Sequence, residues 1–312
     1  AGLSTALMIY TWGGFRFIFL SISIATMIAF FLGKMKKEES TVYGIWFLIS
    51  YMTLISWEGL STTLFDLTAS APALFVFILV IGNLFFGNIL GKKIRGITKK
   101  DWMSDELSIL TVISITGFLA LLAVKPSFAL GIFGELINRL LHPYGSGRVG
   151  LTVAENMQPY TTDMIGQFGK GFFWMLFFGT IILFYETISH FNKREKIILS
   201  LGFTAFLTGF VFSRWSSASI FNGTNFASQI FYFGTMIIFF IALAKIYLKH
   251  SKDENKTSEI LNLNYSYIFI LSLTLLMYLA SKGAIRLLFI SAPVFTILVA
   301  FLHVVLFSYY RK

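Results

Sequence analysis

Cysteine is absent from the 312-residue sequence, and charged residues make up only 13% of it. The lack of thiols excludes disulfide frameworks, thiolate zinc sites and cysteine nucleophiles. A soluble globular chain carries about 25% charged residues, whereas this chain is 56% apolar and has a mean hydropathy of +0.76. The composition therefore excludes a soluble protein and indicates that lipid surrounds most of the chain.

Apolar runs close to the roughly 20 residues that a helix needs to cross a bilayer recur along the chain. They predict an all-α fold, a polytopic transmembrane helical bundle. The nine expected spans are 14–33, 42–57, 73–90, 107–124, 171–189, 197–213, 229–247, 264–281 and 287–308, with 1–12 as the end of a further helix. Ala1 lies within an apolar run, without an initiator Met or a signal-peptide pattern. We therefore expect a fragment or a processed product, with N-terminal spans missing.

The net charge of +10 has two interpretations, a nucleic-acid partner or the enrichment of basic residues on the cytoplasmic side of a membrane. One set of alternate joints between spans holds 17 basic residues: Lys34, Lys36, Lys37, Lys92, Lys93, Arg95, Lys99, Lys100, Lys193, Arg194, Lys196, Lys245, Lys249, Lys252, Lys256, Arg311 and Lys312. The opposite set holds 8: Arg16, Lys125, Arg139, Arg148, Lys170, Arg214, Lys282 and Arg286. This alternation places the second set outside a cell membrane or on the lumenal side of the endoplasmic reticulum, and nucleic acid is not an expected partner.

The external side carries one long segment, residues 125–170, and loops of this length are usually functional. Its first part, which follows Pro126, has an apolar stripe at helical spacing, made of Phe128, Ile132, Phe133, Leu136, Ile137 and Leu140. The pattern predicts an amphipathic helix on the membrane surface, with simple surface packing as the alternative. The remainder, from His142 to Phe168, is polar and rich in Gly, Pro and Thr, and we expect an ordered or ligand-ordered loop.

The loop contains Thr152-Val153-Ala154-Glu155-Asn156-Met157-Gln158-Pro159, preceded by Gly145-Ser146-Gly147-Arg148. An external carboxylate beside Thr, Asn and Gln suits an amide or a hard cation such as Mg²⁺ or Mn²⁺, which prefers oxygen ligands. Glu155 is the candidate ligand, and a solvated loop glutamate is the alternative. Arg148 either binds phosphate or steadies the loop. His142 is a further candidate metal ligand or a hydrogen-bonded surface residue.

Thr152-Val153-Ala154-Glu155 resembles the Ser/Thr-x-x-Glu signature in the fifth external loop of the catalytic subunit of oligosaccharyltransferase, above all in its archaeal members. Gly283-Ala284-Ile285-Arg286, followed by Leu287-Leu288-Phe289-Ile290 and Ser291-Ala292-Pro293, resembles the later external Arg of that family, which opens a span with Pro seven residues on. Trp12-Gly13-Gly14 resembles an earlier helix junction. The resemblance implies a membrane glycosyltransferase of the GT-C type, which transfers a glycan from a polyprenol phosphate or pyrophosphate to Asn in N-x-S/T sequons.

The same resemblance implies roles for individual residues. Glu155 would bind a divalent metal, Mn²⁺ or Mg²⁺, and touch the acceptor amide, with Thr152 and Asn156 beside the substrate. Arg286 would bind the phosphate of the lipid donor, a task suited to its planar guanidinium. Without the resemblance, Arg286 has a second interpretation as an arginine that reaches from the helix to the membrane interface.

The resemblance covers only the central membrane portion of such an enzyme. The first external loop with its Asp, an early Asp/Glu-x-Asp-type motif and the C-terminal domain with a WWDYG motif are missing, so we expect these 312 residues to be inactive alone. Spans 197–247 and their external loop look like an insertion between Glu155 and Arg286, and Met157 interrupts the match beyond Asn156.

Two other kinds of protein remain as alternatives. One is another glycosyltransferase that uses polyprenyl-phosphate sugars, and the other is a polytopic transporter or flippase. Transporters show internal repeats and ionisable groups at mid-membrane, whereas here no clear repeat is found and the charges cluster at the ends of spans. Remaining polar features are Glu186 near an inner span end, Asp66 in an external joint, an external sequon at Asn222-Gly223-Thr224 and an internal one at Asn255-Lys256-Thr257. For Glu186 we expect a side chain that reaches to the membrane interface or has a local partner, rather than a proton relay.

Overall fold

The computed structural model describes residues 1–11, 13–31, 35, 37–66, 69–98, 154–250 and 263–311, together with the single residues 114 and 117. Within these residues the chain is helical and contains no β-strand, apart from one isolated bridge between Arg214 and Asn222. The chain divides into two compact units, Ala1–Glu135 and Leu136–Lys312. The predicted all-α class is therefore confirmed for the described residues.

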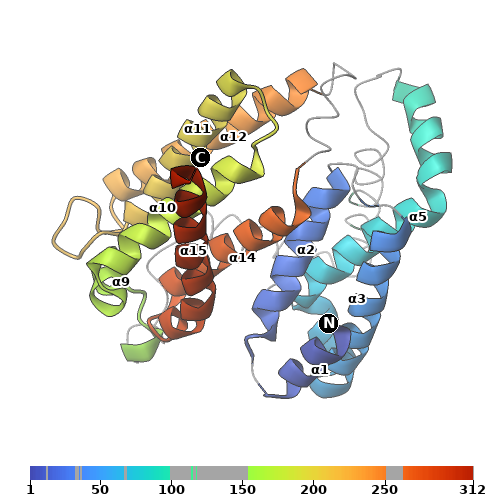
Figure 1. Ribbon diagram of the computed structural model, residues 1–312. Coiled ribbons are helices and arrows are strands. Elements are labelled where there is room, and N and C mark those ends of the chain that lie inside the picture. The colour runs from blue at the N-terminus through green and yellow to red at the C-terminus, as the bar shows by residue number, and fades with distance from the viewer. Residues whose placement is uncertain are drawn as a thin grey trace. The chain divides into compact units, whose positions relative to one another are not determined.

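The first unit contains α1 (Gly2–Thr11), α2 (Phe15–Phe31), α3 (Lys37–Glu58), α4 (Leu60–Phe65) and α5 (Ser70–Thr98). Helix α3 packs on α1 and α5, and α2 also packs on α5 (Figure 1). Aromatic side chains fill the centre, where the rings of Phe47 and Phe77 stack with centroids 4.4 Å apart. The indole of Trp46 donates to Thr5 Oγ1 at 3.1 Å, a buried hydrogen bond that joins α1 to α3.

The second unit begins with a short 3-10 turn at Ala154–Asn156, η1, and continues with α9 (Thr161–Phe168), α10 (Lys170–Thr187), α11 (Lys193–Phe212), α12 (Phe226–His250), α14 (Tyr265–Gly283) and α15 (Arg286–Tyr310). Helices α14 and α15 pack on α10, and α11 pairs with α12 (Figure 1). Between α9 and α10 the chain bends by 112° at Gly169, whose φ of +81° is a conformation that suits glycine.

Close backbone contact joins α11 to α12. A Cβ atom at Gly209 would lie 1.9 Å from Thr235 Oγ1 and 3.0 Å from the carbonyl oxygen of Phe231. Only a residue without a side chain fits there, as in other closely packed membrane helices. Closer to the start of α11, the rings of Phe184 in α10 and Phe203 in α11 stack with their centroids 4.1 Å apart.

Four described helices are long and apolar enough to cross a membrane: α11, α12, α14 and α15. A fifth span results if the bent pair of α9 and α10 counts as one. The predicted spans 14–33, 42–57 and 73–90 are helices as well, but α2 and the apolar part of α5 are shorter than a full span, and Ser, Thr and Tyr residues lower the hydropathy of α3. The predicted span 107–124 and interfacial helix after Pro126 lie outside the described helices.

Polar contacts join helix ends at one end of the second unit. At the end where α10 and α15 finish, Tyr309 donates to Glu186 at 2.9 Å. Where α11 starts and α12 finishes, Lys249 pairs with the buried carboxylate of Glu195 at 2.6 Å. Glu195 and Lys249 belong to joints predicted to be cytoplasmic, and Glu186 lies near the predicted inner end of span 171–189. Of the two expectations for Glu186, the structure shows a local partner, Tyr309.

Candidate functional site

The candidate site lies at the opposite end of the second unit, where α11 and α14 finish and α12 and α15 begin. We call it the Arg214 end, and it comprises Glu155–Thr162, Val211–Asn222 and Lys282–Arg286. Apart from residues 211–213, which end the predicted span 197–213, these residues belong to joints predicted to be external. Figure 1 shows the elements that bring them together: η1, α9 and the ends of α11, α14 and α15.

Glu155 lies in the 3-10 turn before α9 and is exposed. Its carboxylate makes no hydrogen bond or ion pair with any residue that the structure describes. The chain then runs from Met157 to Tyr160 into α9, whose first turn is closed by Asp163, since the carboxylate of Asp163 accepts from the backbone N–H of Tyr160 at 2.7 Å. An exposed carboxylate on an ordered turn is available to a ligand from the water side.

Arg286 is the first residue of α15, which is one of the four candidate spans. The guanidinium is exposed and, within the described part of the chain, forms no hydrogen bond or ion pair. The expectation that Arg286 opens a span is therefore confirmed. Its position at a helix start is compatible both with phosphate binding and with a simple interfacial arginine.

A backbone hydrogen bond brings the Glu155 segment to the start of α15. The N–H of Ile285, the residue before Arg286, donates to the carbonyl oxygen of Met157 at 3.0 Å. Glu155 is two residues from Met157, so the two predicted site residues flank a direct contact although 131 positions of sequence separate them. The sequence placed both residues on one side of the membrane, and the fold places them in one region of the Arg214 end.

Of the other predicted site residues, only Asn156 lies within the part of the chain that the structure describes. Asn156 is half-buried, and its Oδ1 is shielded from solvent without accepting a hydrogen bond from a described residue. Thr152, Arg148 and His142 lie outside the described residues, as does the sequon at Asn255. The part of loop 125–170 that is described, from Ala154 onward, is ordered into η1 and α9.

A divalent ion at this position would need more ligands than the described residues supply. Hard cations take several oxygen ligands, and Glu155 and Asn156 offer one carboxylate and one shielded amide oxygen. The described residues contain no group of three or more His, Cys, Asp or Glu side chains that would hold a metal. The described residues therefore supply too few ligands to hold a resident metal by themselves.

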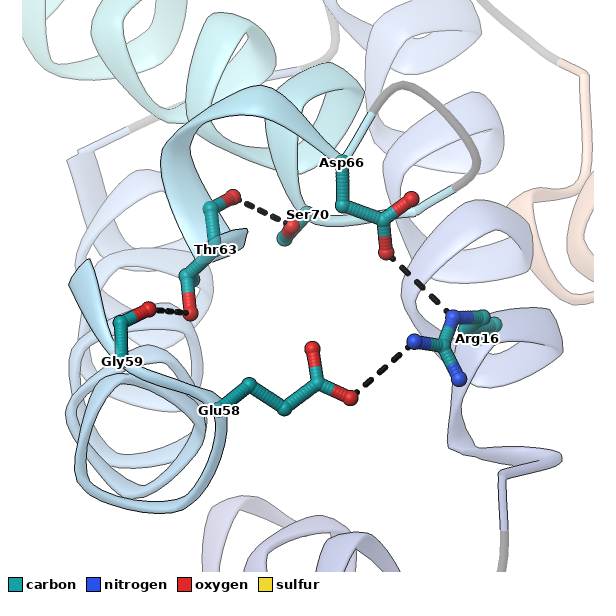
Figure 2. Close-up of polar contacts among 6 residues, drawn as sticks. All are labelled: Arg16, Glu58, Gly59, Thr63, Asp66 and Ser70. Carbon is teal, nitrogen blue, oxygen red and sulfur yellow. Dashed lines mark hydrogen bonds and ion pairs between the residues drawn. The ribbon is translucent and has the colours of Figure 1, made fainter. Parts of the chain in front are cut away.

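The first unit has its own polar cluster, formed by Arg16, Glu58 and Asp66 (Figure 2). Arg16 Nη2 lies 3.0 Å from Glu58 Oε1 and Arg16 Nε lies 3.3 Å from Asp66 Oδ2. The carboxylates are 17% and 13% exposed, so Arg16 joins the start of α2, the end of α3 and the joint before α5. Asp66, for which the sequence suggested no role, is a partner in this ion triad.

The external sequon has a structural role in the second unit. Asn222 Oδ1 accepts from the backbone N–H groups of Thr224 and Asn225, at 2.9 and 3.0 Å, and from Thr224 Oγ1 at 3.2 Å. Gly223 between them has φ +91°. These contacts form the turn that leads from the Ser213 loop into α12, which explains Asn222 and Thr224 without any modification.

Sequence reasoning missed Arg214 and Lys282 as organisers of this end. Both are buried, at 8% and 4% exposure, and Lys282 Nζ donates to the carbonyl oxygen of Val211 at 2.7 Å. A signal was present, because buried cations at the ends of apolar helices are costly and need local partners. The partners themselves come from distant parts of the sequence.

The helices and this polar end define the class of the protein, a multi-pass helical membrane protein. Comparison of the sequence and structure with protein-family models, curated proteins and solved structures finds no match.

Proposed function

We propose that the chain is the central membrane portion of an oligosaccharyltransferase catalytic subunit, which transfers a lipid-linked glycan to asparagine at the external face. The observation that carries the proposal is the Ile285 to Met157 hydrogen bond, since it joins the two segments that resemble that family. The exposed side chains of Glu155 and Arg286 supply a carboxylate and a guanidinium in this region.

In the proposed reaction the amide nitrogen of the acceptor Asn forms a bond to C1 of the first sugar, and the C1–O bond to the lipid phosphate breaks. The phosphate or pyrophosphate leaves with the polyprenol and keeps the electron pair of the C1–O bond, and the proton lost by the amide nitrogen passes to water. An amide nitrogen is a weak nucleophile because its lone pair is delocalised into the carbonyl group. The carboxylate of Glu155 would accept a hydrogen bond from the amide N–H and hold the nitrogen toward the sugar.

Arg286 would bind the phosphate of the donor. Its guanidinium presents parallel N–H groups that match phosphate oxygens, and negative charge grows on those oxygens as the C1–O bond breaks. A fixed cation at that point stabilises the transition state more than the ground state. The resemblance further implies a requirement for Mn²⁺ or Mg²⁺, which is part of the proposal and is tested with it.

The test is glycan transfer from a polyprenol-linked donor to a labelled N-x-T peptide, with the protein expressed from its complete coding sequence. We expect Glu155→Gln to lower turnover by about 100-fold or more, the range typical of positioned catalytic groups. Arg286→Gln should raise the KM for the donor more than the KM for the peptide. Chelation of divalent ions should stop transfer, and Mn²⁺ or Mg²⁺ should restore it.

Glu39→Gln is the matched control, because Glu39 is an exposed glutamate in the first turn of α3. It should leave turnover unchanged. Undiminished transfer by the Glu155→Gln protein at equal expression would refute the proposed function.

A further inference from the structure

We propose that Arg214 is a positioning residue that holds the Glu155 segment against the start of α15. Its effect on catalysis rests on the proposed function, whereas its effect on the geometry does not. The side chain is buried at the end of α11, directly after the C-cap residue Ser213. From there it reaches two external segments that are distant in the sequence.

The guanidinium of Arg214 bonds mainly to backbone oxygen atoms. Nη2 donates to the carbonyl oxygen of Gln158 at 3.1 Å, and Nη1 makes a longer contact of 3.5 Å with the carbonyl oxygen of Asn222. The guanidinium carbon also lies 4.4 Å from the ring centroid of Tyr160, a cation–π distance. One side chain thus touches both the segment that follows Glu155 and the turn before α12.

The backbone around Arg214 strengthens the same connection. Its carbonyl oxygen accepts from the N–H and the hydroxyl of Thr161, at 2.9 and 3.0 Å, and the carbonyl oxygen of Trp215 accepts from Thr162 N at 3.2 Å. Trp215 N in turn donates to Phe221 O at 2.7 Å, which closes the loop into a hairpin. The loop between α11 and α12 therefore contacts the segment that follows Glu155 directly.

Gly223 lets Arg214 lie close to this hairpin. A Cβ atom at Gly223 would lie 2.8 Å from Arg214 Cγ and 3.0 Å from Nη1, and its φ of +91° also disfavours other residues. Any side chain at Gly223 would therefore push the guanidinium away from Gln158. This gives a second way to disturb the contact without changing Arg214 itself.

The opposite side of the Glu155 segment is bound by the turn between α14 and α15. Ile285 N donates to Met157 O, one residue before the Gln158 that Arg214 binds. The ammonium group of Lys282 and the hydroxyl of Thr161 both donate to Val211 O, at 2.7 and 2.6 Å. Residues 157–161 are thus held between the hairpin and α15, and loss of Arg214 removes the guanidinium contacts on the hairpin side.

The absence of cysteine makes a direct test possible. A double variant, Met157→Cys with Ile285→Cys, places thiols on two residues whose backbones share a 3.0 Å hydrogen bond, and a short bismaleimide should link them in membranes that contain the full chain. Arg214→Gln or Gly223→Ala in this background should slow cross-linking about tenfold. Arg214→Lys should give a rate between those of the unaltered background and Arg214→Gln, because Lys keeps the positive charge but lacks the planar guanidinium.

A second pair, Glu186→Cys with Tyr309→Cys, is the control, since these residues meet in an exposed contact at the other end of α10 and α15. Its cross-linking should not respond to Arg214→Gln if the bundle stays folded. Equal loss at both pairs would show general unfolding and refute a specific positioning role. The role would also be refuted by absence of the Met157–Ile285 link in the unaltered background, or by a link that is insensitive to Arg214→Gln.

Activity then separates this inference from the proposed function. In the transfer assay Arg214→Gln should lower kcat at least tenfold and change the donor KM less than twofold, with partial rescue by Arg214→Lys. If Glu155→Gln leaves turnover unchanged, the proposed function fails while the cross-linking result stands. If Glu155 is needed but neither cross-linking nor kcat responds to Arg214, only the positioning role fails.

Discussion

Each unit of the protein has an arginine at the end predicted to be external, and the two arginines are bound in different ways. Arg16 in the first unit is clasped by two carboxylates, whereas Arg214 in the second unit donates to backbone carbonyl oxygens and stacks on a tyrosine ring. In the first case the carboxylates are largely covered. In the second, the nearby Glu155 is left exposed.

This difference separates a structural cluster from a candidate site. The carboxylates of the Arg16 triad are largely covered and therefore poorly accessible to a ligand, and the triad connects three segments within one unit. Arg214 instead donates from Nη1 and Nη2 to backbone carbonyl oxygens. The second unit therefore leaves Glu155 and Arg286, which are both predicted to be external, exposed.

The largest effect on stability should come from the helix contact that supports the hairpin of the second unit. We expect Gly209→Ala to lower the free energy of unfolding by about 2–3 kcal/mol, because the new methyl group overlaps Thr235 and the backbone at Phe231. Thermal unfolding in detergent measures this. Gly234→Ala is the control, since nothing lies within 4 Å of a Cβ there, and equal loss in both variants would contradict close packing at Gly209.

An intermediate effect is expected from the ion triad. Arg16→Gln should cost about 1–2 kcal/mol, because it leaves two largely covered carboxylates without their cation, while solvent at the part-exposed arginine weakens the pair. Arg286→Gln should leave thermal stability unchanged, since that side chain binds no described residue. If the two variants unfolded alike, the division between a structural and a functional arginine would be wrong.

The smallest effect should come from an exposed contact at the opposite end of the second unit. Tyr309→Phe removes the hydroxyl that donates to Glu186, and because this hydrogen bond is exposed, water replaces it. We expect a change below about 0.5 kcal/mol in thermal unfolding. A loss above 1 kcal/mol would mean that this end, and not the Arg214 end, holds α15 in place.

Local patterns predicted much of this architecture. Apolar runs located α2, α10, α11, α12, α14 and α15 to within a few residues, since the length of a span follows from bilayer thickness. They missed the short helices α4 and α9, and α5 runs on to Thr98, beyond the predicted end at 90. Spans 107–124 and the helix after Pro126 stay predictions, as do the roles of Thr152, Arg148 and His142. Sidedness also stays a prediction, because it follows from the 17 to 8 distribution of basic residues.

The sequence by itself determined that the protein is an all-helical membrane protein, and it singled out Glu155 and Arg286 as candidates. Only the tertiary structure decided that an apparent insertion, α11 with α12, holds the segment beside Glu155. The physical reason is range: helix formation depends on residues three or four positions apart, whereas Arg214 bonds to a residue 56 positions away and Lys282 to one 71 positions away. No local pattern specifies such pairs, because a buried cation needs a nearby oxygen but does not determine which one.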